Sequence, residues 1–156
     1  MFEIRRRSLR ELARHKPTHL FSTIIAAMGY AKSLGRDPGE FVRFFMERQT
    51  DWEKLRGDLE GVFRAFVVNF QEHTDMLDDE FDVVVGPEGV SLGAAPIEEL
   101  FKDELEKWGL TPEEVRRGWD ESAPYISRFT GLRVSYDHAN GKYWIHIAGP
   151  VEEPEC

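Results

Sequence analysis

Cysteine is almost absent from this sequence, since the only one, Cys156, is its last residue. A lone cysteine cannot form a disulfide within the chain. Long apolar segments are missing too: the longest, residues 20–31, is interrupted by polar residues and glycine and is shorter than the roughly 20 residues of a membrane span. No apolar segment directly follows the basic residues 5–7, which disfavours a signal peptide. We therefore expect a cytoplasmic protein with no membrane partner.

Positive charge is also scarce, because 20 Lys and Arg face 29 Asp and Glu, giving a net charge of −9. Such an acidic protein is a poor ligand for nucleic acid, whose phosphates require concentrated cations. The charge is uneven: residues 1–16 are basic, whereas residues 72–82 carry acids and no Lys or Arg. Either the basic arm docks on the acidic segment, in this chain or a partner, or both are simply solvated.

The composition is that of a globular protein, with 41% hydrophobic and 31% charged residues among 156. We expect one domain over residues 1–156, with residues 1–17 as a basic N-terminal arm or short helix and residues 150–156 as a C-terminal tail. No internal repeat or low-complexity linker divides it.

Two helix-start signals occur in the N-terminal half. Asp37-Pro38-Gly39-Glu40 places an acid, a proline and a glutamate where a helix begins, and Thr50-Asp51-Trp52-Glu53 repeats a capping box. A break is therefore expected near Gln49–Thr50. Beyond it, apolar residues step by three and four in a heptad-like seam, comprising Trp52, Leu55, Leu59, Val62 and Phe66. Gly57 and Gly61 would then lie one helical turn apart.

The C-terminal half predicts two hairpins with helices between them. Residues 81–92 alternate around a Gly86-Pro87-Glu88-Gly89 turn. A helix over Ile97 to Trp108, a capping box at Thr111-Pro112-Glu113-Glu114 and a short helix over residues 122–131 follow. We expect an α+β fold in which N-terminal helices pack on an antiparallel sheet built from the two hairpins.

Asn140-Gly141 predicts a two-residue type I′ turn, which fixes the register of the last hairpin. Ser135 is then opposite His146, and Asp137 is opposite Trp144. These residues form a polar sheet face with three interpretations: a wall that contacts a ligand, an ordinary exposed surface, or a hydrolase site built on Ser135, His146 and Asp137. A flat strand provides neither a strained nucleophile nor an oxyanion hole, which disfavours catalysis.

Aromatic residues suggest a different site. The chain holds eleven Phe and four Trp, and the phenylalanines between residues 41 and 70 fit either a packed core or an apolar cavity between helices and sheet. The candidate ligand-binding residues are Phe41, Phe45, Phe63, Phe66, Ser135, Trp144 and His146. A metal could use His73 with Glu72, Asp75 and Asp78, but no second histidine recurs at helical spacing, so we assign no metal or cofactor.

Several motifs occur in a recognisable order from Gly86 onward: a hairpin, a helix start at Ala95-Pro96, a helix pair and a hairpin around Asn140-Gly141-Lys142-Tyr143. In this order, and in the earlier Leu34-Gly35-Arg36-Asp37-Pro38, the chain resembles the aminothiazoline-carboxylate hydrolase-like proteins and the related vinyl-reductase-type ligand-binding domains. Such relatives often carry Cys-Pro at the helix start, where this chain has Ala95. The resemblance implies a domain that binds a small apolar or heterocyclic ligand without thiol chemistry.

The leading hypothesis is therefore a small-molecule-binding domain with its pocket between the long second helix, over Phe41 to Phe70, and the sheet. The alternative is an interaction module that forms a homodimer through the heptad-like seam and the Gly57/Gly61 face. A hydrolase that uses the polar sheet face is the third hypothesis.

Overall fold

The structure is a computed structural model that describes residues 22–74 and 76–150. The basic arm over residues 1–17 and the tail residues 151–156, with Cys156, lie outside these ranges, so the predictions for them stay predictions. Between residues 22 and 150, leaving out Asp75, no helix has both the length and the apolar composition that a bilayer crossing requires.

The described chain is α+β, as predicted. Residues 22–33 form the first described helix. The elements that follow are the helices α2 (Gly39–Met46), η1 (Thr50–Leu55), α3 (Leu59–Thr74) and η2 (Asp78–Glu80), the strands β1 (Asp82–Val85) and β2 (Gly89–Ala94), the helices α4 (Ile97–Leu100), α5 (Lys102–Lys107), α6 (Pro112–Asp120) and α7 (Ser122–Thr130), and the strands β3 (Arg133–Ala139) and β4 (Lys142–Ala148).

The two predicted hairpins join into one antiparallel sheet with the strand order β1-β2-β4-β3. The predicted register of the last hairpin is confirmed, since Ser135 pairs with His146 and Asp137 with Trp144. Asn140 and Gly141 have φ angles of 55° and 70°, as a type I′ turn needs. Pairing of β2 with β4 places the closing hairpin beside the first, with β1 and β3 as the edge strands.

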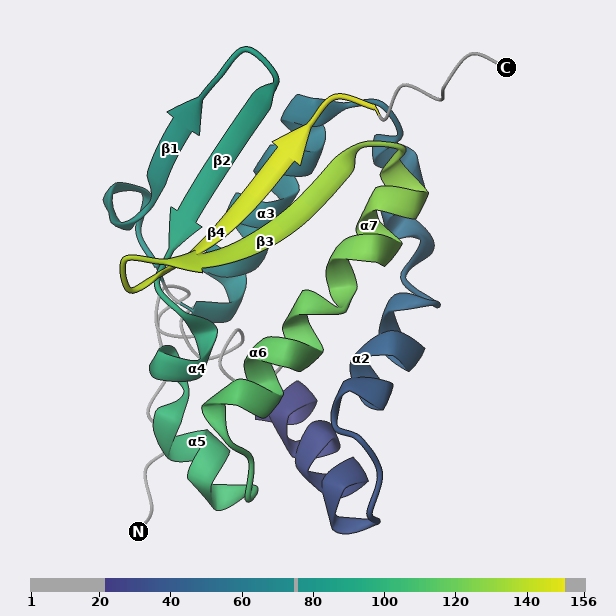
Figure 1. Cartoon of the computed structure of the whole chain (residues 1–156), viewed down its shortest axis with the longest axis vertical. Coiled ribbons are helices and arrows are strands. Elements are labelled where there is room, and N and C mark those ends of the chain that lie inside the picture. Colours follow the sequence, from purple (N-terminus) through teal and green to yellow (C-terminus); the bar gives the residue numbers. More distant parts are fainter. Residues whose placement is uncertain (1–21, 75, 151–156) are drawn as a thin grey trace, which may run out of the picture.

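Helices cover one face of this sheet. Figure 1 shows α3 behind β2 and β4, while α7 runs beside β3. The side chains of Leu92, Ile145 and Ile147 on that face are at most 1% exposed and belong to the hydrophobic core. The opposite face carries the polar residues of the register, with Ser135 and Asp137 exposed. The alternation of the strands therefore separates a core face from a polar face.

Local signals place several helix ends where they were predicted. The Thr111 hydroxyl accepts a hydrogen bond from the Glu114 N–H, and the Glu114 carboxylate accepts one from the Thr111 N–H, which completes the capping box of α6. Asp37 accepts a hydrogen bond from the Gly39 N–H at the start of α2. Gly131, with φ 69°, ends α7 in the left-handed conformation typical of a helix terminus.

The prediction of one continuous helix from Trp52 to Phe66 is wrong. The chain makes the 3-10 helix η1, turns at Gly57, which has φ 74°, and starts α3 at Leu59. The Gly57 N–H donates to the carbonyl of Thr130 at 2.8 Å, a bond to α7 that a continuing helix would forbid. The expected long second helix over Phe41 to Phe70 is thus three elements, and Gly57 and Gly61 do not share a helix face.

The helix predicted over Ile97 to Trp108 is also interrupted. Phe101 leaves helical geometry, with φ −118° and ψ 24°, and separates α4 from α5. Its side chain is buried with the core, so the break keeps an aromatic anchor inside while the two short helices change direction. Pro96 precedes the first helical residue, Ile97, close to the predicted start.

Candidate functional site

A cavity of about 300 Å³ lies between the helical layer and the sheet. Its volume is at the lower end of the range of small-molecule pockets, roughly 300 to 1,000 Å³. Residues from α2, η1, α3, α4, α6, α7 and β3 line it, together with one residue from the first described helix and Gln49 from the segment between α2 and η1. The lining residues are Ile24, Phe41, Val42, Phe45, Met46, Gln49, Trp52, Phe66, Asn69, Phe70, Glu72, Ile97, Trp119, Ser122, Ile126 and Tyr136.

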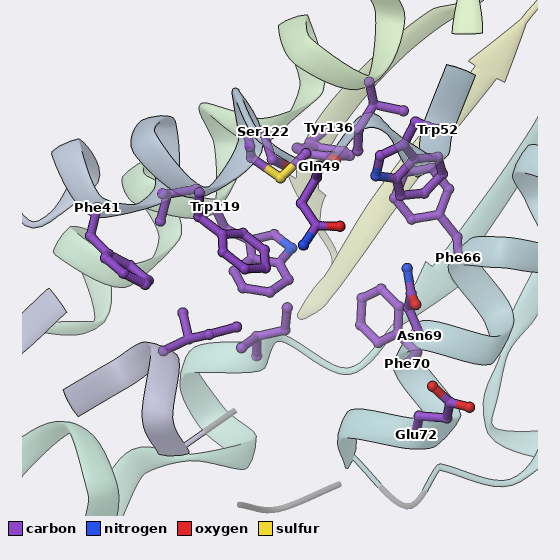
Figure 2. A pocket seen from close by; sticks show the side chains of 16 residues that line it. Phe41, Gln49, Trp52, Phe66, Asn69, Phe70, Glu72, Trp119, Ser122 and Tyr136 are labelled. Carbon is purple, nitrogen blue, oxygen red and sulfur yellow. Dashed lines mark hydrogen bonds between the residues drawn. The ribbon is translucent and has the colours of Figure 1, made fainter. Parts of the chain in front are cut away.

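Aromatic side chains are the largest group in the wall, seven of its sixteen residues, and several of them are labelled in Figure 2. Trp52 and Phe66 lie 5.3 Å apart between ring centroids, and the edge of Phe66 meets Tyr136 at 6.3 Å. Figure 2 shows the Trp52 and Phe66 rings on one side of the view and Phe41 with Trp119 on the other. Such rings supply a large apolar contact area with few rotatable bonds.

Helical spacing accounts for part of this wall. Phe41 and Phe45 are four residues apart on α2, and their rings stack with centroids 6.2 Å apart. Phe66, Asn69 and Phe70 occupy one face of α3 at steps of three and four, so the amide of Asn69 lies between two aromatic positions. The same periodicity that buries Phe66 and Phe70 therefore brings a polar side chain to the cavity.

A pair of hydroxyl groups lies at the wall near the sheet. Ser122 Oγ and Tyr136 Oη are 2.8 Å apart, and Ser122 is 6% exposed at the start of α7. Burial raises the pKa of the Tyr136 phenol well above its ordinary value. Both hydroxyls are therefore neutral at physiological pH and act as hydrogen-bonding groups.

Two carboxamides, Gln49 and Asn69, also line the cavity. Within the described part of the chain neither side chain has a hydrogen-bond partner, and Figure 2 shows both amides pointing into the space between the rings. Glu72 is the only acidic or basic side chain among the described lining residues, and it is exposed. The described wall thus combines aromatic rings, neutral hydrogen-bonding groups and one carboxylate at an exposed position.

Tyr143 on β4 forms a second layer behind this wall. Its ring contacts Phe70 at 6.3 Å and Tyr136 at 5.1 Å between centroids, and its side chain is 2% exposed. Burial raises the pKa of the Tyr143 phenol well above its ordinary value. Its hydroxyl has no hydrogen-bond partner among the residues that the structure describes.

The structure divides the predicted ligand-binding residues into two groups. Phe41, Phe45 and Phe66 line the cavity. Phe63 packs against the hydrophobic core one turn before Phe66 and is not a lining residue. Ser135, Trp144 and His146 lie on the other face of the sheet, so no single site contains all seven.

On the polar sheet face the predicted register holds, but His146 makes its hydrogen bond to the neighbouring strand β2. His146 Nδ1 lies 2.8 Å from the Ser91 hydroxyl, a neighbour on β2 that sequence reasoning missed because the pairing of β2 with β4 was not predicted. Asp137 accepts a hydrogen bond from the adjacent His138 N–H. The indole of Trp144 covers Gly93, where a Cβ would approach the ring to 2.9 Å. Ser135 is exposed and does not line the cavity, which disfavours it as a nucleophile.

The cavity residues that sequence reasoning missed are chiefly Gln49, Asn69, Trp119 and Ser122. Asn69 had a usable signal, its spacing from Phe66. Gln49 lies in the predicted helix break, where periodicity gives no direction for a side chain, and Trp119 and Ser122 reach the cavity only through the packing of α6 and α7.

The described part of the chain contains no group of three or more His, Cys, Asp or Glu side chains arranged to hold a metal ion. The metal hypothesis needs the side chains of His73, Asp75 and Asp78, which the structure does not describe. That hypothesis therefore stays untested.

Comparison of the chain with protein-family models, with curated proteins and with solved structures finds no match in any of the three. The resemblance to the aminothiazoline-carboxylate hydrolase-like and vinyl-reductase-type families therefore stays a prediction. Function has to be argued from the cavity itself.

Proposed function

We propose that this protein is a small-molecule-binding domain and that its ligand occupies the cavity between α2, α3, α7 and β3. One observation carries the proposal: a cavity of about 300 Å³ whose described wall is mainly apolar and includes seven aromatic side chains. The cavity is partly open, and Phe41, Phe45 and Trp119 in its wall are only partly buried. A ligand in this space removes more of their apolar surface from water, which is favourable.

The chemistry of the wall supports binding more than catalysis. Nucleophilic catalysis needs an activated nucleophile with a base in reach. The Ser122 hydroxyl pairs with the neutral phenol of Tyr136, which is no base at physiological pH. The remaining polar lining groups are two carboxamides and one exposed carboxylate. These groups orient a ligand without activating it.

The structure weakens one of the two arguments for the homodimer alternative, the heptad-like seam. Val62 and Phe66 of the heptad-like seam are at most 5% exposed, and Trp52, Leu55 and Leu59 pack against the same core. The seam is therefore used within the chain and is not a free helix face. The oligomeric state itself stays a prediction, which light scattering measures.

Four tryptophans provide the test of the proposed function. Trp52 and Trp119 line the cavity, whereas Trp108 is 40% exposed and Trp144 lies on the polar sheet face. We expect that titrating ¹⁵N-labelled protein with indole shifts the indole N–H signals of Trp52 and Trp119 in a saturable manner and leaves the other two unchanged. If all four signals stay fixed, or only Trp144 responds, the cavity is not the binding site.

A pair of adjacent substitutions on α3 supplies the control. Asn69→Phe places a ring in the cavity, whereas Val68→Phe places the same ring at a side chain that is 46% exposed and outside it. Losing the cavity contacts of a small ring is expected to weaken indole binding by about tenfold or more in Asn69→Phe, with Val68→Phe close to wild type. Equal effects in the two variants would contradict the assignment.

A further inference from the structure

We infer, on the basis of the proposed function, the chemical class of the ligand: a flat, uncharged heteroaromatic molecule that carries a hydrogen-bond donor and an acceptor on its edge. Three features of the described wall point to this class. They are the arrangement of its rings, its lack of cationic side chains and its uncommitted polar groups.

Ring arrangement selects a flat ligand. The Trp52–Phe66 pair and the Trp119 ring lie on different sides of the cavity in Figure 2, and the stacked pair Phe41 and Phe45 extends the wall along α2. Aromatic side chains hold another ring best in offset-stacked or edge-to-face contact, with centroids roughly 4.5 to 7 Å apart. A cavity of about 300 Å³ has room for a bicyclic ring system.

The charges of the described lining residues disfavour an anionic ligand. The described lining residues include no Lys, Arg or His, and Glu72 is a carboxylate. An anion brought into this site would lose its hydration without gaining a counter-ion, and it would meet a like charge. A carboxylate or phosphate ligand is therefore disfavoured, whereas an uncharged ring pays no such penalty.

Lining groups without a hydrogen-bond partner in the described chain favour a ligand with a polar edge. The carboxamides of Gln49 and Asn69 each present a donor and an acceptor, with no partner in the described chain. Ser122 and Tyr136 have two hydroxyl protons between them and share one bond, so one donor remains. A pure hydrocarbon would strip water from these groups and leave them unpaired, which costs free energy. A ligand with a lactam-like edge satisfies them.

Calorimetric titration with three bicyclic probes of similar size tests this inference: naphthalene, quinazolin-4-one and 2-naphthoate. Quinazolin-4-one offers a neutral lactam edge, naphthalene offers none, and 2-naphthoate adds an anion. We expect quinazolin-4-one to bind about tenfold tighter than naphthalene, as one or two net hydrogen bonds predict. We expect 2-naphthoate to bind more weakly than both.

Variants identify the groups that produce this order. In the double variant Gln49→Met, Asn69→Leu, the preference for quinazolin-4-one over naphthalene should fall by about tenfold. Quinazolin-4-one loses its hydrogen-bonding partners, whereas naphthalene no longer strips water from two amides and should bind at least as tightly as to wild type. Glu72→Gln should improve 2-naphthoate binding, whereas Glu60→Gln, which removes the same charge from an exposed site on α3, should change it less.

The outcomes separate this inference from the proposed function. If naphthalene binds as tightly as quinazolin-4-one, or 2-naphthoate binds tightest, the ligand class is wrong although the cavity binds small molecules. Binding of quinazolin-4-one that survives the double variant unchanged also overturns the class. If none of the three probes binds, the proposed function fails, and the inference fails with it.

Discussion

At the scale of single residues, two neighbouring tyrosines show how a buried phenol is accommodated. Tyr136 and Tyr143 have ring centroids 5.1 Å apart, and burial raises the pKa of both phenols. Tyr136 shares a hydrogen bond with Ser122, whereas the Tyr143 hydroxyl lacks a partner among the described residues. Sequence indicated that Tyr136 faces the core, because the Asn140-Gly141 turn fixed the strand alternation. It gave no sign of Ser122, since that contact joins α7 to β3.

The two tyrosines should therefore respond differently to removal of the hydroxyl. Tyr136→Phe leaves Ser122 without its partner and is expected to lower the free energy of unfolding by about 1 kcal/mol. Tyr143→Phe removes an unsatisfied polar atom and should leave stability unchanged or raise it. Urea unfolding of both variants measures this, and a larger loss in Tyr143→Phe would show that its hydroxyl has a partner in the folded protein.

Asp37 links the start of α2 to α6. Burial alone would raise the pKa of this carboxyl, but the Gly39 N–H and the guanidinium groups of Arg43 and Arg117 hold its pKa below the usual 3.8. A carboxyl with a lowered pKa stabilises the folded state above its unfolded-state pKa, and this contribution disappears as the pH falls through the folded-state value.

Wild-type protein should therefore lose stability relative to Asp37→Asn as the pH falls from about 5 to about 3, where carboxyl groups of this kind take up protons. Thermal unfolding across this range measures the difference. A difference in melting temperature that is constant over the whole range would show that the carboxylate charge contributes nothing to stability.

At the scale of elements, signals confined to a few residues predicted several element boundaries. The capping box expected at Thr50-Asp51-Trp52-Glu53 is an exception, because η1 begins at Thr50 and no side chain caps its start. The capping box at Thr111 and the Asn140-Gly141 turn lie where expected because their hydrogen bonds and φ angles depend only on adjacent residues. The apolar spacing from Trp52 to Phe66 led to a wrong prediction of one continuous helix. The spacing continues without interruption across Gly57, where the backbone makes a left-handed turn. The bond from Gly57 to Thr130 that holds this turn is a long-range contact.

Gly57→Ala distinguishes the observed turn from the expected helix. A residue with a Cβ costs roughly 1–2 kcal/mol in the left-handed region, so this substitution should destabilise the protein by about that amount. In a continuous helix the same change would stabilise it by about 1 kcal/mol. The sign of the change in unfolding free energy, measured by chemical denaturation, decides between the two.

At the scale of the whole molecule, the cavity forms only when helices and strands that are distant in the sequence pack together. The α+β class and the sheet from two hairpins followed from patterns along the chain, and so did three of the aromatic wall residues, Phe41, Phe45 and Phe66. The strand order β1-β2-β4-β3 and the meeting of α2, α3 and α7 over β3 did not, because each depends on contacts between distant segments. Hence Gln49 and Ser122, two of the polar residues of the wall, were identified only from the structure.

A crystal structure of the protein grown with saturating indole tests the central claim most directly, because it shows which of the two sequence-derived surfaces holds a small molecule. We expect density for a flat ring in the cavity, in contact with Trp52, Phe66 and Trp119. Density on the polar sheet face beside Trp144 and His146, with the cavity empty or closed by its own side chains, would contradict the claim.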